Sequence, residues 1–166
     1  MVLLFAFPII LILSILQIGI VRNIVLLHGT ADLVLIWLSA WGIQGRVKNA
    51  WIWALIAGIT LSYISALPWY VPFISYGGTM FFARQVNKKI WQSPLMMMFL
   101  VTILGSILLY TLSYGGLLFM GSNISWKDSL LNVIVPSILL NLLFAIPVFA
   151  VAKDFSHWVY PVEANE

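Results

Sequence analysis

Few side chains in this sequence could carry out chemistry, and they lie far apart along the chain. The only histidines, His28 and His157, have no partner at the spacing of a metal site. Asp154, Ser156 and His157 are the residue types of a hydrolytic triad, but they crowd one short segment with no scaffold to separate and orient them. The sequence therefore predicts a protein that is not an enzyme, with no metal site and no cofactor.

The composition is that of a membrane protein. Of the 166 residues, 63% are hydrophobic and 8% are charged, and the mean hydropathy is +1.07. Soluble domains carry about 25% charged residues, so a water-soluble globule is excluded. There is no cysteine, which excludes disulfides and thiolate metal sites. A net charge of +3 is too small to suggest nucleic-acid binding.

Long stretches without ionisable residues predict an all-α, polytopic membrane protein with six transmembrane helices, because a charge at the bilayer centre costs about 2.5 to 3.5 kcal/mol. The expected N-cap of the second helix is Thr30, with Asp32 in its first turn. The last helix is expected to tilt, to kink at Pro136 and Pro147, or to begin in the membrane interface. Residues 1–154 form one predicted domain and residues 155–166 a short tail. The six predicted helices cover residues 2–21, 30–45, 51–67, 69–83, 94–120 and 126–152.

The distribution of basic residues predicts that both chain termini face the cytoplasm. With this orientation, six of the eight Lys and Arg residues lie on the cytoplasmic side, as the positive-inside rule requires. Arg22 and Lys127 lie outside, and Lys153 lies at the cytoplasmic end of the last helix. The predicted cytoplasmic basic loops hold Arg46, Lys48, Arg84, Lys88 and Lys89.

Small residues recur every four positions on two predicted helices, which favours close helix–helix packing in lipid. Either stripe is expected to pack within this chain or against another subunit, and the sequence leaves both open. Asn141 must face protein, because lipid would leave its amide unsatisfied. It is expected to bond a neighbouring helix or a ligand. The two stripes are Ala54, Gly58, Ser62 and Ala66, and Ser137, Asn141 and Ala145.

Over about residues 30–154 the order of features resembles the bacterial rod shape-determining protein MreD. The family often carries an aspartate at the position of Ser62. The resemblance rests on the second-helix start Thr30-Ala31-Asp32-Leu33, the segment Ala57 to Ser65, the basic run Arg84 to Lys89, and the stretch from Pro136 through Asn141 to Pro147.

This resemblance implies a non-enzymatic adaptor of the cell-elongation, peptidoglycan-synthesis machinery in the bacterial inner membrane. Its implied partners are MreC and, through it, MreB, a RodA-like glycosyltransferase and a class B penicillin-binding protein. The family is similar in fold to the substrate-binding S-components of vitamin transporters. A vitamin-binding subunit is therefore one alternative, with Asn141, Tyr63, Tyr76 and Trp69 around a pocket. An accessory subunit of a respiratory or photosynthetic complex is another.

Overall fold

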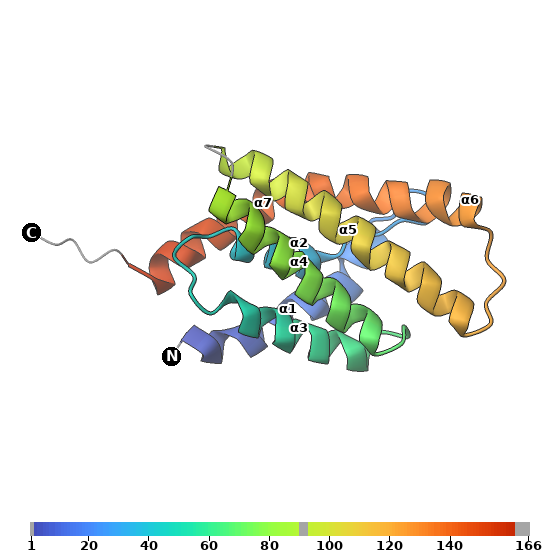
Figure 1. Cartoon of the computed structure of the whole chain (residues 1–166), viewed down its shortest axis with the longest axis horizontal. Helices are drawn as coiled ribbons and strands as arrows, with labels where there is room; N and C mark the ends of the chain where they lie inside the picture. Colours follow the sequence, from blue (N-terminus) through green and yellow to red (C-terminus); the bar gives the residue numbers. More distant parts are fainter. Residues whose placement is uncertain (1, 90–92, 162–166) are drawn as a thin grey trace, which may run out of the picture.

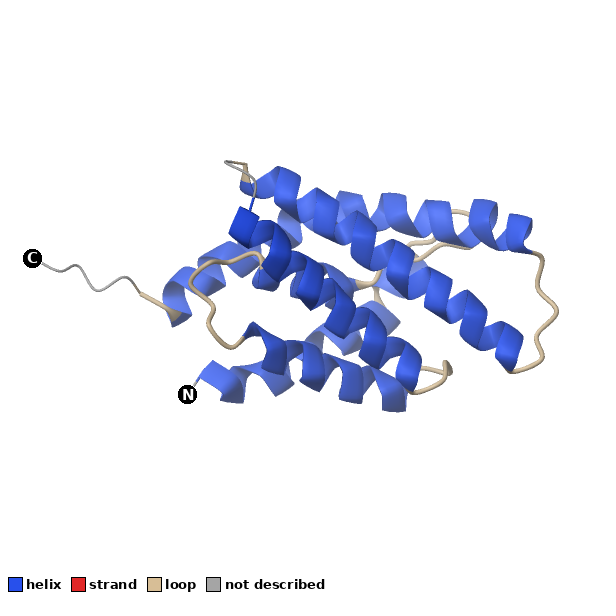
Figure 2. Cartoon of the chain, in the orientation of Figure 1, coloured by secondary structure: helices blue, strands red, loops and turns tan. Residues whose placement is uncertain are grey.

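The computed structural model describes residues 2–89 and 93–161, and the regular structure of these residues is helical (Figures 1 and 2). Three helical segments are long and apolar enough to cross a membrane: Phe5–Asn23, Pro94–Phe119 and Trp126–Val159. The elements are α1 (Val2–Gly19), η1 (Val21–Asn23), α2 (Leu33–Gly42), α3 (Ala50–Ile64), α4 (Tyr70–Lys89), α5 (Pro94–Phe119), α6 (Trp126–Ser129), η2 (Leu130–Ile134) and α7 (Val135–Val159).

Helix α2 is short and central. Its ten residues are all buried, and it packs against α4, α5 and α7. At 1.5 Å per residue it is about 15 Å long, half of the ~30 Å thickness of a bilayer core. A helix that is apolar on every side belongs inside a protein, which agrees with this position. The expectation of a helix over residues 30–45 with Thr30 as N-cap is corrected, because Asp32 is the N-cap and accepts from Leu35 N.

Helix α4 continues through the basic run that was expected to form a loop. Arg84, Lys88 and Lys89 belong to its C-terminal end, because no Gly or Pro follows Gly78 before the helix ends. Arg46 and Lys48 do lie between α2 and α3. The Arg84 guanidinium donates to the Val47 carbonyl, which joins the end of α4 to that connection.

Helix α7 extends beyond its predicted end. It continues to Val159, so the tail expected from residue 155 is helical over its first five residues. The Phe155 ring centroid is 5.5 Å from that of Trp41, and Ser156 is fully buried. These contacts bury part of the last turns of α7 in the core, which explains why the helix continues. The π-helical turn η2 ends at Ile134, directly before α7. Pro136 is the second residue of α7, and Pro147 lies inside the same helix.

The small-residue stripe of α3 packs inside this chain rather than on its surface. Ala54 and Gly58 are buried, and a Cβ on Gly58 would lie 3.1 Å from Phe73 Cα of α4. The Ser62 hydroxyl is 2.6 Å from the Gly58 carbonyl oxygen. Ala66 is exposed and outside the stripe, because α3 ends at Ile64. Gly58 of this stripe therefore lies at the contact between α3 and α4.

Two helical glycines give a matched test of this packing. We expect Gly58→Ala to lower the free energy of unfolding by about 1 to 3 kcal/mol, because the added methyl group overpacks the contact with Phe73. Gly77→Ala should leave stability unchanged or raise it by up to about 1 kcal/mol, since nothing lies within 4 Å of the new Cβ and alanine favours a helix. Thermal unfolding in detergent measures both. Equal melting temperatures for the two variants would contradict the packing.

Candidate functional site

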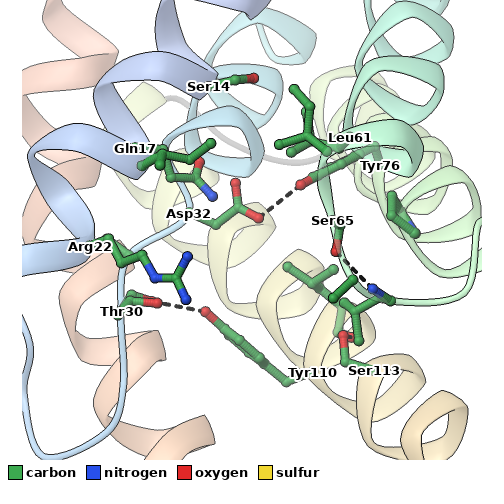
Figure 3. Close-up of a pocket in the computed structure, with 17 residues that line it drawn as sticks. Ser14, Gln17, Arg22, Thr30, Asp32, Leu61, Ser65, Tyr76, Tyr110 and Ser113 are labelled. Atoms are coloured by element: carbon green, nitrogen blue, oxygen red, sulfur yellow. Dashed lines mark hydrogen bonds between the residues drawn. The ribbon is translucent and has the colours of Figure 1, made fainter. Parts of the chain in front are cut away.

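A cavity of about 510 Å³ lies among α1, the start of α2, the end of α3, α4 and α5 (Figure 3). Its walls are mixed, with leucine and isoleucine side chains alternating with hydrogen-bonding groups. A space of this size is in the range of small-molecule pockets, about 300 to 1,000 Å³. The polar side chains on its wall belong to Ser14, Gln17, Arg22, Thr30, Asp32, Ser65, Tyr76, Tyr110 and Ser113.

Asp32 is the buried acid of this cavity. Its side chain is 7% exposed, and both carboxylate oxygens accept hydrogen bonds: Oδ1 from Leu35 N at 2.9 Å and Oδ2 from the Tyr76 hydroxyl at 2.9 Å (Figure 3). The first bond satisfies a free N–H at the start of α2, and the carboxylate faces the positive end of the helix dipole. Asp32 therefore holds α2 to α4.

The backbone before α2 is held by α5 and α7. Asp32 N donates to Asn141 Oδ1 at 2.7 Å, and Asn141 Nδ2 donates to Ser106 Oγ at 2.8 Å. Thr30 N donates to Ser137 Oγ at 3.1 Å, and the Tyr110 hydroxyl donates to the Thr30 carbonyl at 3.1 Å (Figure 3). These four bonds place the start of α2 between two long helices.

The loop before Thr30 comes into direct contact with α7. Pro136 has no N–H to offer the Asn132 carbonyl one turn earlier, and His28 N donates to that carbonyl at 3.0 Å instead. Gly29 lies so close that a Cβ would be 2.6 Å from Ser137 N. Only glycine fits here, and the loop is thereby pressed against the helix.

The second predicted stripe is fully used inside the bundle. Ser137, Asn141 and Ala145 are each 1% exposed or less. The Asn141 amide bonds Asp32 and Ser106, so the interhelical bond that was one of two expectations for Asn141 is present. Asn141 lies behind the cavity wall and does not line it.

Other residues that the sequence had suggested do not come together. Of the four side chains expected around a vitamin pocket, only Tyr76 lines the cavity. Tyr63 and Trp69 are 88% and 71% exposed. At the end of α7, Ser156 is buried and donates to Lys153 O, whereas His157 is exposed, so Ser156 and His157 do not form a nucleophile–base pair.

Two hydroxyls of the cavity wall bond within their own helices. Those of Ser14 and Ser113 donate to the carbonyls of Ile10 and Leu109. In residues 2–89 and 93–161, no three His, Asp or Glu side chains gather as a metal site would need. Hydrogen bonds and charge are what this wall presents to a molecule inside it.

Sequence reasoning missed Asp32 as a cavity residue, together with Gln17, Arg22 and Tyr110. Asp32 was interpreted as a first-turn acid at the end of a helix, near the membrane border. The usable signal was the shortness of the apolar stretch that follows it: an acid before a helix too short to span lies deeper in the bundle.

Comparisons with protein-family models, curated proteins and solved structures find no match to this chain.

The contribution of the Asn141 hydrogen bonds to stability can be tested by comparison with Asn23, whose side chain bonds the end of its own helix. Asn141→Ala removes the acceptor of Asp32 N, and an unpaired buried N–H costs about 1 to 3 kcal/mol. We expect a clear fall in melting temperature in detergent. Asn23→Ala, which loses only an exposed bond to Gly19 O, should have a much smaller effect. A fall of the same size in both variants would argue against the Asn141 network.

Proposed function

We propose that this chain is a non-enzymatic membrane adaptor of the cell-elongation machinery, similar to MreD, in the bacterial inner membrane. It binds an MreC-like protein through the outer surfaces of its helices. Through that protein it is connected to MreB, a RodA-like glycosyltransferase and a class B penicillin-binding protein. Six membrane-crossing segments with both termini in the cytoplasm are part of the proposal.

The observation that carries the proposal is the outward surface of the long helices. Large apolar side chains repeat at helical spacing there, as with Leu139, Leu143 and Ile146 of α7, which are 54%, 67% and 54% exposed. Polar groups such as Asn141 and Ser137 are turned inward. A protein built in this way meets lipid and the helices of other membrane proteins. The order of sequence features supports MreD among such adaptors.

Because residues of both small-residue stripes pack within the chain, a partner is expected to bind elsewhere on its surface. Because Gly58 and Asn141 are committed to contacts within the chain, their substitution acts on the fold first. An MreC-like partner is expected on exposed faces of the helices instead.

Depletion in a rod-shaped host tests the cellular role. Loss of the protein should produce rounded cells, because elongation synthesis loses an adaptor, and re-expression should restore rods. Gly77→Ala serves as a folding-neutral control, and an MreC-like protein should co-purify with both it and the wild type. Cells that keep their shape after complete depletion would contradict the proposal.

The absence of cysteine makes the topology easy to test. Single-cysteine variants Lys48→Cys and Lys88→Cys should both be labelled from the cytoplasm only, since the positive-inside rule places both positions on that side. Lys127→Cys should react with an impermeant thiol reagent added to intact cells. Labelling of Lys48→Cys and Lys88→Cys from opposite sides would remove one crossing from the proposed six.

A further inference from the structure

Two side chains of opposite charge line the same cavity. Asp32 lies on the buried part of its wall, with 7% of its surface exposed, and Arg22 is an exposed residue just after α1. Figure 3 shows both side chains extending into one space between α1 and α5. The cavity therefore has a buried carboxyl group and an exposed guanidinium on its wall.

The Asp32 carboxylate has room for a further partner. Leu35 N and the Tyr76 hydroxyl each occupy one of its oxygens, whereas an ionised carboxylate offers about four lone-pair sites. Among the described residues, the neighbours that act on this carboxylate are backbone N–H groups and Tyr76, and they include no Lys or Arg. A buried charge is stabilised by an opposite charge, so a cation in the cavity would bind here.

Arg22 is the second ionisable side chain on the cavity wall, and it does not pair with Asp32. Its guanidinium lines the cavity yet makes no ion pair with Asp32, so it remains free to bind an anionic group. A ligand with only an ammonium group would be repelled by Arg22, and a ligand with only an anionic group would be repelled by Asp32. A ligand that carries both charges meets two attractions.

The cavity wall also carries apolar side chains, with Leu61, Ile64 and Leu109 among them. A volume of about 510 Å³ is large enough for a small organic molecule. The middle of the ligand is therefore expected to be a short hydrocarbon segment.

We propose that this cavity binds a zwitterion, with a primary ammonium group on Asp32, an anionic group on Arg22 and a short apolar segment between them. This goes beyond the adaptor role, which needs no ligand. Both a soluble ω-amino acid and the headgroup of a phosphoethanolamine lipid have this chemistry. Binding rests on hydrogen bonds and charge, and no covalent step is involved.

Thermal unfolding of the full chain in a non-ionic detergent tests the proposal with named probes. The soluble probe is ω-aminohexanoate, compared with hexylamine and hexanoate, which each retain one charge. The lipid probe is lysophosphatidylethanolamine, compared with lysophosphatidylcholine, whose trimethylated ammonium cannot donate a hydrogen bond to Asp32. We expect one zwitterionic primary amine to raise the melting temperature saturably, and the comparison compounds to need at least about tenfold higher concentration. Whether the soluble or the lipid probe acts identifies the source of the ligand.

Variants that remove one charge each test which residue binds the anionic group of the ligand and which binds its ammonium group. Arg22→Gln changes an exposed side chain and should fold normally, yet weaken the zwitterion at least about tenfold, which is about 1.4 kcal/mol. Asp32→Asn should weaken it similarly, although this variant also perturbs the start of α2. Lys127→Gln, an exposed basic residue that does not line the cavity, should bind as the wild type does.

Three results would overturn the proposal. The first is that Arg22→Gln, which leaves the hydrogen bonds of Asp32 in place, binds the zwitterion with wild-type affinity. The second is equal stabilisation by hexylamine and ω-aminohexanoate. The third is no response of the wild-type protein to either zwitterionic probe. Failure of this ligand would leave the cell-shape test of the adaptor role unaffected, because depletion and co-purification do not depend on the cavity.

Discussion

The rest of the structure depends on one constraint: the free backbone N–H groups at the start of α2 must find hydrogen-bond partners. All ten residues of α2 are buried, so the free N–H groups at its start need partners from the protein. Asp32 supplies one with its carboxylate, and Asn141 accepts the N–H of Asp32 itself. Asp32 and Asn141 therefore help to hold the fold together. Helix α4, whose Tyr76 bonds Asp32, and helix α7, which carries Asn141, must lie within hydrogen-bond distance of the start of α2.

The connection before α2 follows from the same requirement. To bring Asp32 to Asn141, the loop has to run along α7, where Pro136 leaves the Asn132 carbonyl without its helical partner. His28 N occupies that carbonyl, and Gly29 allows the backbone to approach closely enough. A proline and a glycine distant in sequence thus form one contact. The cavity is lined by the end of this loop together with the end of α3, the start of α4, and α1 and α5.

The opposite end of the bundle is held by a different interaction. Trp41 of α2 packs with Trp53 of α3, with ring centroids 4.6 Å apart, and with Phe155 of α7 at 5.5 Å. These large rings pack closely against one another at this end. The molecule therefore has a polar end, where the cavity around Asp32 lies, and an aromatic end, and α2 joins the two.

Composition and charge spacing determined that the chain is helical and apolar enough for a membrane, because a buried charge and an unpaired backbone group are each costly in lipid. The helix starts at Pro94 and Trp126 and the inward orientation of Asn141 follow from local chemistry of the same kind. Tertiary structure alone decided the rest. The pairing of Asp32 with Tyr76 and the helical end at Phe155 depend on residues far apart in sequence, whose contacts no local pattern encodes.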